Sequence, residues 1–129
     1  MLQSNPFNIS QTQEADNSLE NNQPKPSGHI FLKAAARLLK IYPEEILWIE
    51  ALGDYVVINT IKEKYTIHST MKGIELKLPS EDFIRVHRSF IVRIDQINAI
   101  EGKILVIDKK LIPVSKSYKK GLINRLNLL

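Results

Sequence analysis

The sequence has no cysteine and no long apolar run. Without cysteine there is no disulfide framework, no thiol nucleophile and no zinc site with thiolate ligands. No uninterrupted apolar stretch approaches the roughly 20 residues that a membrane span requires. The first ten residues combine neither a basic start nor an apolar segment, so no signal peptide is visible. These absences predict a soluble cytoplasmic protein that does not enter a membrane.

Catalytic and metal-binding motifs are also missing. The chain has no GxSxG elbow, no GxxxxGK[ST] loop and no GxGxxG fingerprint. Its histidines, His29, His68 and His87, are far apart and lack ligand spacing. His87 and Ser89 lie two residues apart, but a nucleophile–base pair also needs an orienting acid and an oxyanion site. We therefore expect no enzyme, no catalytic residue, no metal site and no cofactor.

Positive charge is concentrated in the last third of the chain. Of 129 residues, 43% are hydrophobic and 25% are charged, which is typical of one globular domain. Residues 1–28 carry a net charge of −2 and residues 29–82 a net charge of −1. Residues 83–129 contain ten Lys/Arg and three Asp/Glu, a net charge of +7. A polyanion is the obvious partner for this charge, and a solvated basic face without a partner is the alternative.

The first 28 residues differ in composition from the rest. They are rich in Asn, Gln, Ser and Pro, and their few apolar residues show no period. Pro24, Pro26 and Gly28 close this stretch with residues that oppose helix formation. We expect residues 1–28 to be a disordered N-terminal arm or linker and residues 29–129 to be the folded domain.

Short strands dominate the expected domain, because β-branched runs alternate with turn residues. Two apolar runs at 29–33 and 37–41 form either a hairpin or one strand with a bulge, and Pro43 begins a brief helical turn. Further strands are expected at 45–50, 55–60, 64–68, 83–87, 89–94, 97–100, 103–108 and 111–114. Glu101-Gly102 and Asp108–Lys110 are the expected turns of the last three strands, and Pro113 indicates a sheet edge.

Two short helices complete the pattern. A stripe at helical spacing predicts the first helix, formed by Ile67, Met71, Ile74 and Leu78. Ser69 or Thr70 is its expected cap and Pro79 its end. Tyr118, Leu122, Ile123 and Leu126 give the C-terminal segment one apolar face, which predicts a second amphipathic helix.

Two segments combine basic and hydroxyl side chains. In FIRVHRSFIVRIDQI, residues 83–97, an extended backbone places Arg85, His87 and Ser89 on one face and Arg88 on the other. Such groups must be solvated, ion-paired or bound to an anion, because burying an unpaired charge is very costly. The second segment is PVSKSYKKG, residues 113–121, whose Lys116, Lys119, Lys120 and Ser117 lie near a helix start and suit phosphate oxygens. The two segments form one binding surface if they lie side by side.

These segments resemble the LytTR family of bacterial DNA-binding domains. The resemblance is carried by FIRVHRSFIV, INAIEG and IPVSKSYKKGL, preceded in the same order by EILWIEALGDYVVINT and STMKGIELKLP, and it covers about His29 to Leu129. It implies a mainly β, elongated, sandwich-like stack of antiparallel sheets with two short helices. It also implies a transcription regulator, usually the output domain of a two-component response regulator, whose loops enter the major groove of paired promoter sites bound by two copies.

The resemblance assigns site residues one by one. The loop at Gly53, Asp54 and Tyr55 is expected in a groove, and His87, Arg88 and Ser89 are expected on bases and backbone. Lys116 and Ser117 are expected in the neighbouring groove, with Lys119 and Lys120 on phosphate. Many relatives carry a second basic residue where this chain has Ser117, so either Lys116 serves in its place or base reading there differs. The Asp54 carboxylate either accepts from a cytosine amine or repels phosphate.

Structural alternatives stand beside three of these assignments. Tyr55 is either a DNA contact or a core aromatic at a strand start. His87 is either a contact or a buried histidine that shapes its segment. Arg88 is the best base-reading candidate, because a guanidinium fits guanine O6 and N7 bidentately.

A second functional hypothesis remains open at this point. The chain is then a protein-interaction module that uses an open β edge and the apolar C-terminal face. A receiver domain needs roughly a hundred further residues. We therefore expect any receiver domain or sensor kinase to lie outside this chain: either the polar arm links the domain to a receiver, or the domain is a stand-alone regulator.

Overall fold

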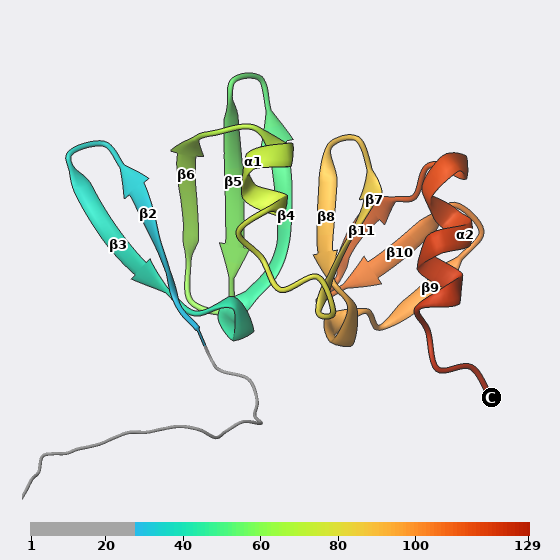
Figure 1. Cartoon of the computed structure of the whole chain (residues 1–129). Helices are drawn as coiled ribbons and strands as arrows, with labels where there is room; N and C mark the ends of the chain where they lie inside the picture. Colours follow the sequence, from blue (N-terminus) through green and yellow to red (C-terminus); the bar gives the residue numbers. More distant parts are fainter. Residues whose placement is uncertain (1–27) are drawn as a thin grey trace, which may run out of the picture.

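A computed structural model describes residues 28–129, and these form an elongated row of antiparallel sheets with two short helices (Figure 1). The arm predicted at residues 1–28 lies, except for Gly28, outside the described residues. The mainly β, sandwich-like architecture expected from the sequence is confirmed.

The elements follow one another along the chain with short connections. The first half contains β2 (Ile30–Ala34), β3 (Arg37–Ile41), the 3-10 turn η2 (Pro43–Glu45), β4 (Ile46–Leu52), β5 (Tyr55–Thr60), β6 (Lys64–His68) and α1 (Met71–Glu75). The second half contains β7 (Phe83–His87), β8 (Phe90–Arg93), η3 (Ile94–Gln96), β9 (Ala99–Glu101), β10 (Ile104–Ile107), β11 (Lys110–Pro113) and α2 (Lys116–Asn124).

The strands form three sheets. A β2–β3 hairpin stands at one end, a five-stranded sheet of order β6-β5-β4-β8-β7 occupies the middle, and a three-stranded sheet of order β11-β10-β9 stands at the other end. Every strand pair is antiparallel. The pairing of β4 with β8 joins two hairpins that are far apart in sequence, with Ile49 opposite Ile91. This pairing makes the middle sheet continuous across the molecule.

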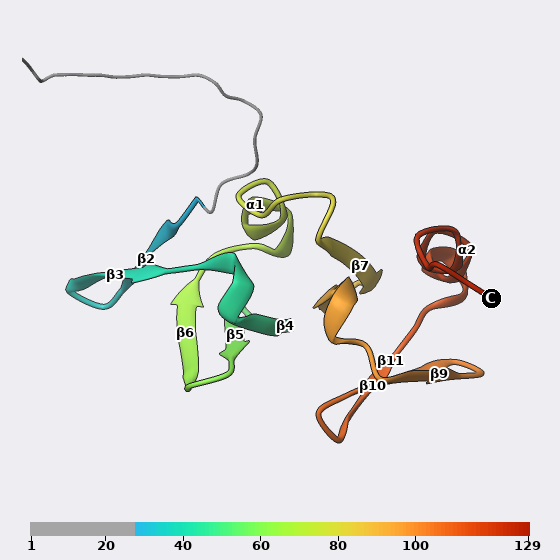
Figure 2. The ribbon, with the colours of Figure 1, turned by 90° about the horizontal axis from the view of Figure 1, so that it is seen from below.

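Each face of the middle sheet covers its own core, because successive side chains of a strand point to opposite faces. In β8, Ile91 packs into a first core with β2, β3 and α1, whereas Phe90 and Val92 pack into a second core. The second core includes the buried Leu105 of the three-stranded sheet and Leu122 of α2. Figure 2, seen from below, shows α1 and α2 on the same side of the molecule.

The first helix is shorter than the sequence pattern predicts. Ile67 belongs to β6, where it pairs with Val56, so it is not part of a helix. The position of Ile67 fits both the helical stripe and the alternation of a strand. The pairing of β6 with β5 continues through His68 and places Ile67 in the strand. Thr70 is the cap, and its hydroxyl accepts from the Gly73 N–H at 2.9 Å. Leu78 is buried beyond the helix end, so the stripe correctly predicted burial but not helix length.

Several strand boundaries differ from expectation by one or two residues. β4 runs through Leu52, and β8 ends at Arg93, where η3 begins. The β9–β10 turn is Gly102-Lys103, because Glu101 pairs with Ile104. Gly102 adopts a φ of +62°, which glycine accommodates without strain. The last turn uses Asp108 and Lys109, both with positive φ, and leaves Lys110 in β11.

The two apolar runs at 29–33 and 37–41 form a hairpin and not one strand with a bulge. β2 and β3 pair over their whole length, from Ile30 opposite Ile41 to Ala34 opposite Arg37. Ala35 turns the chain with a φ of +55°. β11, which ends at Pro113, is an edge strand as predicted.

Candidate nucleic-acid interface

The β7–β8 hairpin presents Arg88 and Ser89 in a two-residue turn. His87 pairs directly with Phe90, and a β-bulge interrupts the register between Arg85 and His87. The expectation that Arg85, His87 and Ser89 alternate along one strand is therefore wrong, because the bulge and the turn break the period. Arg88 is exposed at the tip, whereas His87 and Ser89 are half-buried beside it.

Hydrogen bonds from three directions fix this turn. The Arg85 guanidinium donates from Nη2 to the Arg88 carbonyl oxygen at 2.6 Å. The Ser89 N–H donates to His87 Nδ1 at 3.0 Å, and the Ser89 carbonyl accepts from the Ala51 N–H at 2.9 Å. The His87 ring also packs edge-on against Phe90, with 5.8 Å between centroids. Contacts from β4, β7 and β8 thus fix the conformation of this turn.

Arg85 lies beneath the turn and not at its tip. Its side chain is 23% exposed, its Nη1 lies 3.6 Å from Glu75 Oε1 of α1, and its Nε is buried without a partner. The Arg85 guanidinium thus links the Arg88 carbonyl of the turn to the Glu75 carboxylate of α1. The structure therefore separates Arg85 from the exposed Arg88, although both belong to the same predicted basic segment.

The β4–β5 turn presents a second candidate segment. Gly53 turns the chain with a φ of +59°, and Asp54 follows it at the exposed tip. Tyr55 is 50% exposed and meets the His68 ring edge-on at 5.3 Å between centroids. The alternative of Tyr55 as a core aromatic is therefore wrong.

The start of α2 presents the third segment. Lys116, Ser117 and Lys120 are exposed, and Ser115 caps the helix without a side-chain hydrogen bond. The first helical turn contains no acidic residue, so its N–H groups and the lysines share one sign of potential. Lys119 is half-buried and donates from Nζ to the Gly102 carbonyl at 2.7 Å, which ties it to the β9–β10 turn.

Backbone hydrogen bonds join the three segments. The Ala51–Ser89 bond places the end of β4 beside the β7–β8 turn, and the Ser115 N–H donates to the Val86 carbonyl at 2.8 Å, which places α2 beside β7. In Figure 1 the β4–β5 turn, the β7–β8 turn and the start of α2 all lie at the upper end of the molecule. The two basic segments therefore lie side by side, as the sequence required for a single surface.

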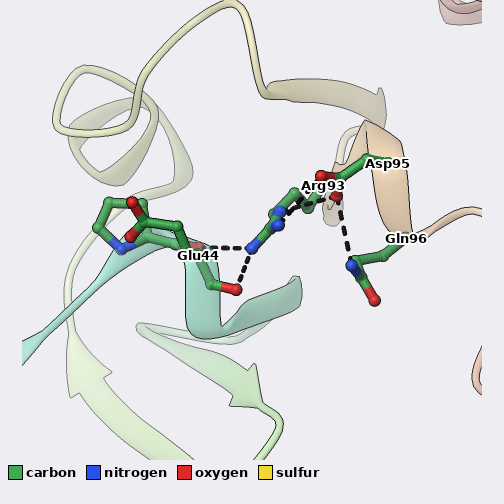
Figure 3. A network of polar contacts seen from close by, with 5 residues as sticks. Glu44, Arg93, Asp95 and Gln96 are labelled. Carbon is green, nitrogen blue, oxygen red and sulfur yellow. Dashed lines mark hydrogen bonds and ion pairs between the residues drawn. The ribbon is translucent and has the colours of Figure 1, made fainter. Parts of the chain in front are cut away.

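Two other arginines of the basic third, Arg93 and Arg125, bind groups within the fold. Arg93 donates to both carboxylate oxygens of Asp95, at 2.8 and 3.0 Å, and to the carbonyls of Pro43 and Glu44 (Figure 3). Hydrogen bonding from Arg93 holds the pKa of the Asp95 carboxyl below its usual range. Arg125 donates to the Ser80 carbonyl at 2.8 Å. Within residues 28–129, neither Arg88 nor Lys116 nor Lys120 forms an ion pair.

The same geometry bears on the other sequence hypotheses. Ser89 meets His87 through its backbone N–H, which donates to His87 Nδ1, and not through its hydroxyl. In the described part of the chain no three His, Asp or Glu residues gather as metal ligands, and no helix is long and apolar enough to cross a membrane. The apolar face of α2 packs on the second core through Leu122 and Leu126, which leaves less of it for a protein partner.

Two supporting groups were missed at the sequence level. Glu75 lies off the apolar stripe of its helix, and nothing in the sequence relates it to Arg85. The Ala51 N–H acts through the backbone and carries no signal in residue type. Only the fold brings either group to the Arg88 turn.

Comparison with known proteins gives consistent matches. The family model of the LytTr DNA-binding domain matches residues 36–127. The sensory transduction protein LytT of Bacillus subtilis is 31% identical over 109 residues, covering 80% of this chain and 45% of that protein. The transcriptional regulatory protein NatR of Bacillus subtilis is 32% identical over 71 residues, covering 55% of this chain and 30% of that protein. The chain thus spans less than half the length of either relative.

A solved structure matches the fold. The LytTr DNA-binding domain of a Bacillus cereus protein superposes with a TM-score of 0.67 at 27% identity, covering 78% of this chain and 97% of the other. The match therefore spans almost the whole of that domain.

Proposed function

Since the chain belongs to the LytTR family of DNA-binding domains, we propose that residues 29–129 bind double-stranded DNA at specific sequences and thereby regulate transcription. The observation that carries this proposal is the convergence of three exposed segments at one end of the fold. Backbone bonds from Ser89 and Ser115 tie these segments together, and the middle one exposes an unpaired Arg88. A rigid set of loops with free cations is suited to the grooves and phosphates of a duplex.

The β7–β8 and β4–β5 turns make different contacts with DNA. Arg88, at the tip of a braced turn, reads base edges, since a guanidinium pairs bidentately with guanine O6 and N7. Asp54 and Tyr55 enter a neighbouring groove, where the carboxylate accepts from a base amine such as that of cytosine. His87 and Ser89 hold the turn through their mutual hydrogen bond, and Ser89 also faces the duplex. Arg85 acts through Arg88 as a positioning residue.

The start of α2 supplies the phosphate contacts. Lys116 and Ser117 lie in the first helical turn, where free N–H groups favour an anion. Lys120 is exposed one turn further along. Lys119 contributes its charge from a fixed position beside Gly102. Lys119 and Lys120 give affinity that does not depend on sequence, whereas Lys116 and Ser117 also reach the neighbouring groove.

The names of the relatives support a proposal about the larger assembly. LytT is named a sensory transduction protein and NatR a transcriptional regulatory protein, so we infer that this chain serves as an output module of two-component signalling in the bacterial cytoplasm. In that role a receiver domain or a sensor kinase provides the input. Two copies occupy repeated sites in a promoter.

Fluorescence anisotropy of the whole chain with labelled mixed-sequence duplexes tests the proposal. Log K should fall by about 0.9 for each neutralised phosphate per decade of salt, because bound cations release counterions. Selection from a random duplex library should then return one preferred site. A lack of binding at about 50 mM salt, or a selection without any enriched sequence, would overturn the proposal.

A further inference from the structure

The β2–β3 hairpin is a basic element whose charges have no role in the surface described above. The chain contains no Asp or Glu between Gly28 and Pro43, whereas Lys33, Arg37 and Lys40 lie there. The family match starts at residue 36 and so leaves out β2 and half of the turn. Nothing in that match assigns a function to this hairpin.

The tip of the hairpin lies at the same end of the molecule as the DNA-facing turns. In Figure 1 the β2–β3 turn, the β4–β5 turn, the β7–β8 turn and the start of α2 all lie along the upper edge. Figure 2, turned by 90°, shows the same succession from the β2–β3 hairpin to α2 across the molecule. A duplex that runs along the three proposed DNA-facing segments and continues past β4–β5 therefore reaches the hairpin tip.

The side chains at the tip are available for such a contact. Ala34 pairs with Arg37 and Lys33 pairs with Leu38, so both basic residues occupy the last two registers before the turn. Lys33 and Arg37 are exposed, and within residues 28–129 neither forms an ion pair. Ala35 and Ala36 are also exposed, so the turn itself is small and permits close approach to a sugar–phosphate backbone.

We propose that the tip of the β2–β3 hairpin is a further DNA-backbone contact, in which Lys33 and Arg37 bind phosphates beyond the β4–β5 turn. This inference rests on the proposed function. Alanines at the turn offer no side-chain donor or acceptor with which to read the hydrogen-bonding groups of a base edge. The contact therefore adds affinity and lengthens the footprint without changing the preferred sequence.

The test is a charge-removal pair in the full chain. The double variant Lys33→Gln/Arg37→Gln should lower the slope of log K against log salt by about 1.8, since two phosphates at about 0.9 each are lost. The matched control is Lys62→Gln/Lys64→Gln, which removes the same charge from the β5–β6 end of the middle sheet. Lys62 pairs with Glu45 at 3.3 Å, and Lys64 starts β6 at the end away from His68. The control should leave the slope nearly unchanged.

Shortened duplexes locate the contact. Trimming the preferred site from one side should make the wild type bind like the hairpin variant, whereas trimming from the other side should preserve their difference. An unchanged slope in the hairpin variant, or an equal drop in the control, overturns the hairpin contact. A wild type that binds duplex strongly, yet shows either result, leaves the proposed function standing. A wild type that binds no duplex at all overturns both.

Discussion

Arg88 and Arg93 are five residues apart on one hairpin, yet the fold uses them in opposite ways. Arg93 is only 13% exposed at its side chain and is held by Asp95 and by two backbone carbonyls. Arg88 is exposed, its carbonyl accepts from Arg85, and within residues 28–129 its guanidinium forms no ion pair. The net charge of a segment therefore overstates what a ligand can reach. An arginine is free for recognition only where the fold places no carboxylate and no carbonyl against its guanidinium.

Replacing the free arginine should have the largest effect on binding. Arg88→Ala should weaken the preferred duplex by about 1–3 kcal/mol, roughly 5- to 150-fold, and relax the preference at particular base pairs. The free energy of unfolding should change by no more than about 0.5 kcal/mol, because the side chain contacts solvent. Anisotropy with the selected site and its single-base variants measures this. Unchanged affinity and preference would show that another residue reads the site.

Replacing Arg93, whose guanidinium is bound within the fold, should lower stability and leave DNA binding unchanged. Arg93→Ala should lower the free energy of unfolding by about 1–2 kcal/mol, because charge-assisted hydrogen bonds to Asp95 and to two carbonyls are lost. Binding to the preferred duplex should stay the same at temperatures where the variant is folded. Urea unfolding followed by circular dichroism gives the first quantity, and anisotropy gives the second. If binding fell as much as in Arg88→Ala, the division between the two arginines would be wrong.

The intermediate case is Arg85, which is basic but buried beneath the turn. Arg85→Gln should cost about 0.5–1.5 kcal/mol of preferred-site affinity through the lost bond to the Arg88 carbonyl. The salt slope should remain that of the wild type, because no phosphate contact is removed.

Glu75→Gln is the matched variant for Arg85. It removes a negative charge and yet should weaken sequence preference in the same direction, since it releases Arg85. A slope that drops by about 0.9 in Arg85→Gln would instead identify Arg85 as a phosphate contact.

The smallest effect concerns pH and the Arg93 partner. Asp95 has its pKa lowered in the folded state, so its contribution to stability is present above the unfolded value near 4 and is lost as pH falls through the lower folded value. Asp95 is largely exposed, so the contribution is at most about 0.5 kcal/mol. Urea unfolding should separate wild type from Asp95→Asn at pH 7, and the difference should shrink as the pH falls below about 4. A difference that persists in acid would point to packing.

Local patterns predicted much of this fold, and long-range partners were outside their reach. β-branched runs located β5, the Thr70 cap was one of two expected, and the family resemblance implied the stacked sheets. The bulge at Arg85 and His87 was not predictable, because it arises from pairing with β8 and not from residue type. Ile67 fitted a helical stripe, but its pairing with Val56 decided its state. For the site, the sequence indicated the two basic segments. Only the structure shows that Arg88 is exposed whereas Arg85 and Arg93 bind groups within the fold.

The exposed end of the molecule also has a direction. A hairpin stands at one end of the row and a helix start at the other, with two dissimilar turns between them. No rotation exchanges these elements, so one copy lacks the twofold symmetry of a palindrome and meets DNA in a single orientation. In the proposed binding of two copies, each half-site is therefore asymmetric, and reversing it presents its bases to the wrong turns. Whether two half-sites are direct or inverted repeats then dictates whether two copies lie head to tail or face each other.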